Sequence, residues 1–250
     1  MPDMPAAPSY LARSEGVRLA YRHRKGTGPT IVFLPGYMSD MEGGKALALD
    51  AWAEANGRAM LRLDYSGCGS SEGHFIDGTL PIWRDDVLIL LDKLVEGPFV
   101  IVGSSMGGWL ALLVALARPE RLTALIGIAA APDFTDWGFT QEQKLSILRD
   151  GKIEEPSEYA DQPYVTTKAF WQSGEASRLL HGSIAIDCPV RLLHGQRDDA
   201  VPWRNALTLA QQIRSADVQI LLIKDGDHRL SRDQDLARLI DAVATLPEPI

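Results

Sequence analysis

A serine set between glycines is the first group in this chain that could do chemistry. Ser105 lies in the sequence Gly-Ser-Ser-Met-Gly at 103–107, directly after the apolar run 99–102 and directly before a helix-like stretch over 109–117. A strand that reverses into a helix within a few residues holds its serine in a strained conformation, and small flanking residues avoid collisions there. The pattern Gly-x-Ser-x-Gly alone is common by chance, so the flanking strand and helix are what make Ser105 a candidate nucleophile.

A serine hydroxyl attacks a carbonyl group poorly unless a base takes its proton and a carboxylate orients that base. His228 follows the last apolar run of the sequence and precedes its final helix, which makes it the predicted base. Asp198 follows the preceding apolar run, before a helix that Pro202 can begin, and is the predicted acid. Asp133 stays open as an alternative acid, because it follows the strand before that one.

The negative charge that develops on an attacked carbonyl oxygen needs backbone N–H donors. They commonly come from the residue after the nucleophile and from an early strand-to-helix loop. These positions are Met106 and Tyr37, and Gly36 lets the chain bend so that the next amide points inward. Three tryptophans are further predicted to contact substrate: Trp109, Trp137 and Trp203.

Two other features resemble functional motifs and are interpreted as structural. The loop over 64–71 has two glycines after an apolar run, but it completes no Gly-x-Gly-x-x-Gly and carries no Gly-Lys-Ser/Thr, so we expect a tight turn. Cys68 and Cys188 are far apart and in no Cys-x-x-Cys pair, which argues against a disulfide framework or a structural zinc site. No cofactor and no metal ion are expected.

Apolar runs alternate with amphipathic stretches along the chain, and these elements must position the candidate residues. The stretches between the runs have helical periodicity, clearest over 83–94, and strands joined through helices form a mainly parallel sheet with helices on both faces. The sequence thus predicts an α/β fold in a single domain over 1–250, with a further strand over 17–22 at an antiparallel edge. The predicted buried strands are 30–34, 59–63, 99–102, 122–128, 190–193 and 218–223.

Residues 132–185 interrupt this alternation and are predicted to form a helical cap inserted within the domain. Helical stretches around 141–148 and 167–171 alternate with prolines, and no convincing buried strand is present. Such an insertion is suited to cover an apolar pocket, because it is rich in aromatic residues. These are Phe134, Trp137, Phe139, Tyr159, Tyr164, Phe170 and Trp171.

The bulk composition excludes several classes of protein. With 46% hydrophobic residues, the 250-residue chain can bury a large core without disulfides or metal. A net charge of −8, with no basic cluster interleaved with aromatics, argues against nucleic acid as a partner. No apolar run reaches the ~18 residues of a membrane span. The N-terminus lacks the basic and apolar regions of a secretory signal, so we expect a cytoplasmic location.

Several stretches together resemble the α/β hydrolase superfamily. They lie at 33–40, 63–71, 83–87, 102–109, 188–195 and 227–230 and cover most of the body of the chain. Pro-Gly-Tyr at 35–37, Gly-Ser-Ser-Met-Gly-Gly-Trp at 103–109 and Val-Pro-Trp at 201–203 are more particular to one branch of it. That branch is the mitochondrial palmitoyl-protein thioesterases and acyl-glucuronide esterases among the α/β-hydrolase domain-containing proteins.

This resemblance implies a serine esterase or thioesterase that works through an acyl-enzyme, with Ser105, Asp198 and His228 as nucleophile, acid and base. Its substrate would be a small ester or thioester, or an S-acylated protein. The chain departs from the branch in showing no mitochondrial targeting segment, which adds to the expectation of a cytoplasmic protein. Two alternatives stay open: a non-catalytic ligand receptor or scaffold on the same fold, and a cofactor-free perhydrolase or C–C bond hydrolase that uses the same serine.

Overall fold

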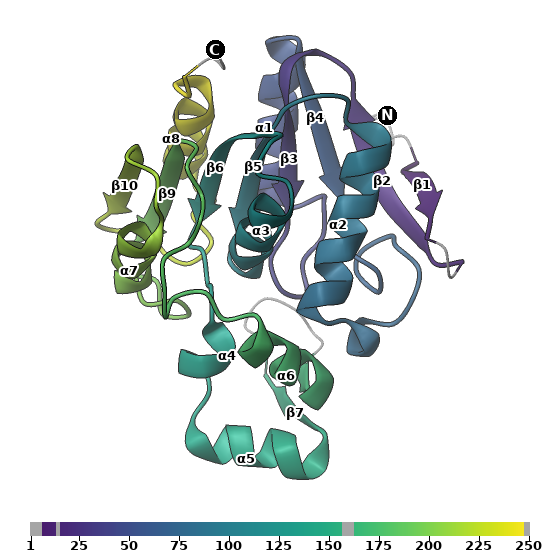
Figure 1. The fold of residues 1–250 in the computed structure, drawn as a ribbon, viewed down its shortest axis with the longest axis vertical. Helices are drawn as coiled ribbons and strands as arrows, with labels where there is room; N and C mark the ends of the chain where they lie inside the picture. The colour runs from purple at the N-terminus through teal and green to yellow at the C-terminus, as the bar shows by residue number, and fades with distance from the viewer. Residues whose placement is uncertain (1–6, 14–15, 157–162, 248–250) are drawn as a thin grey trace.

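The computed structural model describes residues 7–13, 16–156 and 163–247 of the chain. At its centre lies an eight-stranded sheet in the order β1-β2-β4-β3-β5-β6-β9-β10 (Figure 1). β1 pairs antiparallel with β2, and β2 with β4, while every pairing from β4 to β10 is parallel. The strands are β1 (Ser9–Ala12), β2 (Arg18–Arg24), β3 (Thr27–Leu34), β4 (Arg58–Leu63), β5 (Phe99–Ser104), β6 (Leu122–Ile128), β9 (Val190–Gly195) and β10 (Val218–Ile223).

Helices cover both faces of this sheet, because each parallel pairing needs a crossover connection. One core lies beneath α1 and α8, and the other lies beneath α2, α3 and α7 (Figure 1). β3 shows the alternation that this requires: Ile31 and Phe33 belong to the first core, whereas Val32 and Leu34 belong to the second. The helices are α1 (Gly44–Ala55), α2 (Leu80–Leu94), α3 (Met106–Ala117), α7 (Arg204–Gln212) and α8 (Asp233–Ala244), with a short 3-10 turn, η1 (Phe75–Asp77), before α2.

All of the predicted buried strands are present, and the α/β fold with its mostly parallel sheet is confirmed. The strand expected at the antiparallel edge is present as β2, but it is not the edge strand, because β1 pairs outside it. The sequence pattern does not reveal β1, since a four-residue strand with mostly exposed side chains contains no buried apolar run.

The described residues of the predicted cap, 132–156 and 163–185, lie at the carboxyl ends of the parallel strands, at the lower end of the molecule in Figure 1. Its helices are α4 (Phe134–Trp137), α5 (Gln141–Asp150) and α6 (Lys168–Ala176). Between α5 and α6 it also contains an antiparallel pair of strands, β7 (Lys152–Glu155) and β8 (Tyr164–Thr167), which the sequence pattern did not predict. Strands of four residues, mostly of intermediate or full exposure, contain no buried apolar run. Tyr159 lies outside the described residues.

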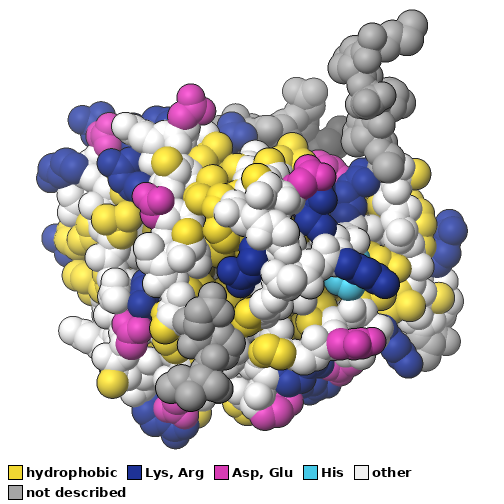
Figure 2. Space-filling view, turned by 90° about the horizontal axis from the view of Figure 1, so that it is seen from above, with side chains coloured by type: hydrophobic (Ala, Val, Ile, Leu, Met, Phe, Trp, Pro, Cys, Tyr) yellow, Lys and Arg dark blue, Asp and Glu magenta, His cyan; other side chains and the backbone are white. Residues whose placement is uncertain are grey.

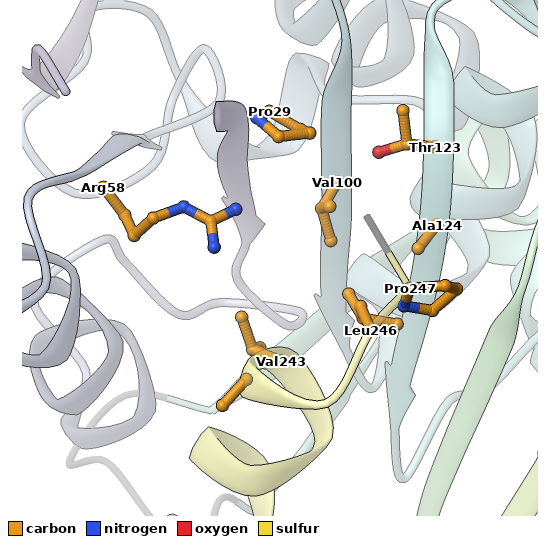
Figure 3. A pocket seen from close by; sticks show the side chains of 9 residues that line it. Pro29, Arg58, Val100, Thr123, Ala124, Val243, Leu246 and Pro247 are labelled. Carbon is orange, nitrogen blue, oxygen red and sulfur yellow. The ribbon is translucent and has the colours of Figure 1, made fainter. Parts of the chain in front are cut away.

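The opposite end of the molecule carries a small hollow. Figure 2 shows this end, where basic and acidic side chains are scattered among hydrophobic ones with no large patch of one sign. The hollow has a volume of about 30 Å³, enough for about one water molecule, and lies between Arg58, Val100 and the end of α8 (Figure 3). Its described lining offers no carboxylate or imidazole, so it is not a candidate for catalysis.

Two further findings concern the described residues alone. None of their helices combines the length and the apolar character that crossing a bilayer requires. None of their His, Cys, Asp and Glu side chains form a group of three or more that could hold a metal ion.

Candidate active site

Ser105 lies at the sharp turn between β5 and α3. Its backbone has φ of 55° and ψ of −121°, a conformation that costs non-glycine residues energy and is kept mainly at functional sites. Three backbone hydrogen bonds hold it there. The N–H of Ser105 donates to Ile128 O at 2.9 Å, and its carbonyl oxygen accepts from Gly108 at 2.9 Å and from Ala131 at 3.1 Å. The turn thereby places Ser105 on the wall of a cavity.

The glycines around Ser105 are required because the turn packs against neighbouring backbone. A Cβ atom on Gly107 would lie 2.2 Å from the carbonyl oxygen of Leu34, and one on Gly103 would lie 2.2 Å from that of Gly107. Backbone atoms cannot move aside as the end of a flexible side chain can, so larger residues would force the turn open. The motif therefore reflects close packing of α3 against the ends of β3 and β5.

Three side chains from distant parts of the sequence meet beside this turn. Nε2 of His228 lies 3.1 Å from Ser105 Oγ, and Nδ1 of His228 lies 2.8 Å from Asp198 Oδ2. Asp198 follows β9 and His228 follows β10, and the parallel strands deliver both loops to the same edge of the sheet as Ser105. In this arrangement the hydroxyl can pass its proton to Nε2 while the carboxylate keeps a proton on Nδ1.

The carboxylate of Asp198 is fully buried and accepts four hydrogen bonds. Oδ1 accepts from the N–H groups of Ala200 and Val201, at 2.9 and 2.7 Å. Oδ2 accepts from His228 and, at 3.2 Å, from Nε2 of His194. Burial by itself raises the pKa of this carboxyl, but the hydrogen bonds from His194 and His228 outweigh burial and hold the pKa well below its usual range. Asp198 is therefore ionised at neutral pH.

His194 is a neighbour of the site that sequence reasoning did not single out. Its ring is buried, and its Nε2 atom lies 3.0 Å from the carbonyl oxygen of Val201 as well as 3.2 Å from Asp198 Oδ2. Both of these atoms are acceptors, so Nε2 carries a hydrogen and donates to them. The only sign of this contact in the sequence is that His194 and Asp198 are four residues apart, at the end of β9.

Asp133, the alternative acid, is engaged elsewhere. Its two carboxylate oxygens accept from the N–H of Leu179, at 2.8 and 3.1 Å, and one of them also accepts from Leu180 at 2.8 Å. These bonds tie the beginning of the cap to its end. Within the described chain Asp133 makes no hydrogen bond to His228, and Asp198 is the carboxylate that lies beside that ring.

Tyr37 and Met106 both line the cavity beside Ser105. The loop before Tyr37 approaches the serine closely, since a Cβ atom on Gly36 would lie 3.3 Å from Ser105 Cβ. Neither the N–H of Tyr37 nor that of Met106 donates to an acceptor in the described part of the chain. Met106 is the first residue of α3, where helical N–H groups lack an intrahelical partner. Two free donors beside a hydroxyl are what an oxyanion requires.

The cavity in front of Ser105 has a volume of about 680 Å³, within the range of about 300–1,000 Å³ typical of small-molecule sites. The body contributes Tyr37, Met38 and His228 to its wall, and the cap contributes three aromatic residues. These are Phe134, Trp137 and Tyr164. The cavity thus has a polar floor at Ser105 and an aromatic side formed by the cap.

Of the three tryptophans predicted to contact substrate, Trp137 lines this cavity, whereas Trp109 and Trp203 do not. Trp109 is fully buried in α3, and its indole N–H donates to Ser177 O at 3.2 Å. Trp203 precedes α7, with the Arg204 guanidinium 4.6 Å from its ring centre. A position near Ser105 or Asp198 in the sequence does not by itself place a side chain in the cavity, because the direction of the side chain decides which surface it meets.

Lys45 adds a titratable charge to the cavity wall. It lies in the first turn of α1, and its Nζ atom donates to the carbonyl oxygen of Arg229. Burial, followed by the positive charge of Arg229, lowers the pKa of the Lys45 ammonium to about 8. The charge of the cavity wall therefore changes just above neutral pH.

The glycine-containing loop over 64–71 is a turn built around its own carboxylate. Oδ1 of Asp64 accepts from the N–H of Met41 at 2.7 Å, and Oδ2 accepts from Ser70 at 2.8 Å. A Cβ atom on Gly69 would lie 2.3 Å from this carboxylate. Other N–H groups of the loop donate to Asp86 and to backbone oxygens within or next to the loop, so few donors are left for a phosphate, and we interpret the loop as structural.

Comparison with known proteins agrees with the fold. Residues 31–242 match the profile described as the alpha/beta hydrolase family. The chain belongs to this family. Palmitoyl-protein thioesterase ABHD10, mitochondrial, of Homo sapiens is 43% identical over 242 residues, which are 95% of this hydrolase and 79% of the relative. The Mus musculus protein of the same name is 44% identical over 245 residues, 96% and 82% of the two chains.

Solved structures of this hydrolase's relatives extend the likeness to three dimensions. Alpha/beta hydrolase domain-containing protein 10 from mouse matches with a TM-score of 0.89 at 43% identity, covering 96% of this chain and 97% of that one. A putative hydrolase from Agrobacterium vitis S4 matches with a TM-score of 0.90 at 36% identity, covering 96% and 98%. The predicted resemblance to the α/β hydrolases and to the palmitoyl-protein thioesterase branch is confirmed.

The same comparison corrects the expected location. The relatives that match this hydrolase over nearly its whole length carry the word mitochondrial in their names, which points away from a cytoplasmic location. The expectation of a cytoplasmic protein is therefore wrong. It rested on the N-terminal residues, which carry no sign of a secretory or mitochondrial signal, and on a cysteine-poor composition, which does not distinguish one reducing compartment from another.

Proposed function

We propose that this hydrolase cleaves acyl thioesters through a covalent acyl-enzyme, with Ser105 as nucleophile, His228 as base and Asp198 as acid. The observation that carries the proposal is the position of the His228 ring, which lies within hydrogen-bond distance of Ser105 Oγ and of Asp198 Oδ2 at once. An imidazole placed between a hydroxyl and a carboxylate can move one proton in each half of a hydrolytic cycle.

In the first half of the cycle, Ser105 Oγ attacks the carbonyl carbon while His228 Nε2 takes the hydroxyl proton. The ionised Asp198 stabilises the imidazolium that forms, and the N–H groups of Tyr37 and Met106 donate to the oxyanion. The carbon–sulfur bond then breaks, and the leaving thiolate takes from His228 the proton that came from Ser105. The product is the acyl ester of Ser105 and a free thiol.

In the second half, His228 takes a proton from a water molecule, and the hydroxide attacks the acyl ester of Ser105. The tetrahedral intermediate collapses, the bond to Oγ breaks, and Oγ recovers its proton from His228. A carboxylic acid is released and the enzyme returns to its starting state.

The aromatic side of the cavity and the names of the relatives support a fatty acyl thioester as substrate. Phe134, Trp137 and Tyr164 offer an apolar surface on the cap for an acyl chain. The relatives are named palmitoyl-protein thioesterase, which favours an S-acylated protein or a small acyl thioester. Oxygen esters of the acyl-glucuronide type undergo the same chemistry and are the second substrate class that we propose to test.

Ser105→Ala is expected to lower kcat on a palmitoyl thioester by at least about a thousandfold, because losing a triad nucleophile costs several orders of magnitude. Thiol release is the measurement, and a urea unfolding curve checks that the fold is intact. Ser146→Ala, on α5 and outside the cavity lining, serves as the matched control and should keep wild-type turnover. A Ser105→Ala enzyme that retained a tenth of the activity would refute the proposal.

A fluorophosphonate probe separates the proposal from its alternatives. A serine hydrolase is expected to form an adduct at Ser105, whereas a receptor or scaffold on this fold would form none. A perhydrolase or a C–C bond hydrolase would also be labelled. It would turn over hydrogen peroxide with a carboxylic acid, or a diketone, in preference to matched esters and thioesters.

A further inference from the structure

Tyr37 is joined to the cap by its side chain. Its hydroxyl donates to the carbonyl oxygen of Val165, in β8, at 2.6 Å. Its ring also contacts three aromatic rings of the cap, those of Phe134, Tyr164 and Phe170, with centroids 6.0, 6.4 and 4.9 Å away. A residue of the body thus makes its side-chain hydrogen bond and three aromatic contacts with the cap, while its backbone stands beside Ser105.

The loop that carries Tyr37 is held from the body as well. The hydroxyl of Tyr65, which is fully buried, donates to the carbonyl oxygen of Pro35 at 2.9 Å. Immediately after Tyr37, Met38 has φ of 52°, a conformation that a non-glycine residue keeps only when its surroundings enforce it. The Tyr37 ring also packs on two rings of the body, those of Phe75 and Trp83, with centroids 5.0 and 6.1 Å away. The position of the Tyr37 amide is therefore set from the body, by these rings and by the Tyr65 hydroxyl, and from the cap, by the hydrogen bond of the Tyr37 hydroxyl.

The strand that accepts this hydrogen bond also forms part of the wall that an acyl chain would touch. Tyr164 lines the cavity, and Val165 is its neighbour in β8. An acyl chain long enough to reach Tyr164 packs on the same strand that holds the Tyr37 hydroxyl. A short acyl group, bound only near Ser105, leaves β8 without that contact.

We propose that Tyr37 is a positioning residue through which the cap sets the oxyanion donor, so that the length of the acyl chain under the cap controls kcat. This inference rests on the proposed function. An acyl chain that packs against Tyr164 restricts the movement of β8. The hydrogen bond between the Tyr37 hydroxyl and the Val165 carbonyl then restricts the loop that presents the Tyr37 N–H. Because the oxyanion exists only in the transition state and the intermediates near it, the effect falls on kcat more than on KM.

Tyr37→Phe removes the hydrogen bond and keeps the ring. We expect kcat to fall about fivefold on octanoyl and dodecanoyl p-nitrophenyl esters, the worth of about one hydrogen bond, and to change by less than twofold on the acetyl ester. The decisive quantity is the ratio of wild-type to variant kcat, which should grow with chain length. Reading a ratio removes the intrinsic reactivity of each ester from the comparison.

Tyr65→Phe is the matched control, because it removes the hydroxyl that ties the same loop to the body. Its ratio of wild-type to variant kcat should be the same at every chain length. A Tyr37→Phe ratio that is also independent of chain length would overturn the inference, since the hydroxyl would then be a general support of the loop.

Amide hydrogen exchange tests the same link without turnover. Tyr37→Phe should speed exchange in the loop over 36–39 and in β8 together, whereas Tyr65→Phe should affect only the loop. Unchanged exchange in β8 of Tyr37→Phe would contradict the inference. If the wild-type enzyme hydrolysed no ester or thioester, the proposed function would fail, while the exchange data would still report whether Tyr37 couples the loop to the cap.

Discussion

Asp198 shows at the scale of a single residue how neighbours decide what a side chain can do. Its loop contains a second carboxylate, Asp199, which is exposed. Asp198 alone is buried among four donors, and those donors outweigh the cost of burying its charge. His194 provides one of the four, to Oδ2, the same oxygen that accepts from His228. The orientation of the proposed base thus depends on a histidine that is not itself part of the cavity lining.

His194→Phe is expected to raise the pKa of Asp198 toward its usual range, because a hydrogen bond that stabilises its charge is lost. We expect kcat/KM at neutral pH to fall about tenfold, because Asp198 then holds the ring of His228 less firmly. Steady-state rates measure this fall, and NMR titration of the Asp198 carboxyl measures its pKa. His194→Gln, whose amide can donate from a similar position, should recover part of the activity. Wild-type kcat/KM in His194→Phe would show that His194 only fills space.

At the scale of elements, the turn from β5 to α3 is the most constrained part of the site. Ser105 keeps a strained backbone because its amide and carbonyl groups are tied to the ends of β6 and α3. The glycines beside it have a second role, since they let α3 begin in contact with the end of β3. The same contact brings Tyr37, which follows β3, beside Met106, the first residue of α3.

Gly107→Ala is expected to lower the free energy of unfolding by about 2 kcal/mol, because its Cβ atom would lie 2.2 Å from a backbone oxygen of Leu34. Urea unfolding measures this. Gly44→Ala, at the first position of α1 with open space around its Cβ, is the control, and it should leave the free energy of unfolding unchanged or raise it by less than about 1 kcal/mol. Equal stability of Gly107→Ala and the wild type would mean that the turn can open without cost.

At the scale of the whole molecule, the strand order brings the site together. β3, β5, β9 and β10 run parallel, so the loops that carry Tyr37, Ser105, Asp198 and His228 all leave the sheet at one edge. The cap lies over that edge and adds aromatic side chains to the cavity wall. Burial also lowers the pKa of Lys45, which lines the same cavity.

Lys45→Met is expected to be more stable than the wild type at pH 7, and this difference should shrink as the pH rises from 8 to about 10.5. The pKa of Lys45 in the folded protein is about 8, below the usual 10.5. Below pH 8 both the folded and the unfolded chain carry the ammonium, and its burial lowers the free energy of unfolding in full. Above about pH 10.5 neither chain carries it, and this cost is gone. Urea unfolding at pH 7, 8, 9 and 10 gives the difference.

The control for this experiment is Lys224→Met, on the exposed surface after β10. Its difference in stability from the wild type should stay constant over the same range of pH. A difference between Lys45→Met and the wild type that was likewise constant would mean that Lys45 is not buried in solution.

The sequence by itself determined the sheet, the turn at Ser105 and the order of the proposed nucleophile, acid and base along the chain. These features follow from local patterns, because apolar runs, glycine spacing and helix signals lie in neighbouring residues. Only the tertiary structure brought Asp198 rather than Asp133 to His228, set His194 beside Asp198, left Trp109 and Trp203 outside the cavity and tied Tyr37 to β8. Each of these depends on which surfaces meet across long sequence separations, and a contact of that kind leaves no periodic signal in the chain.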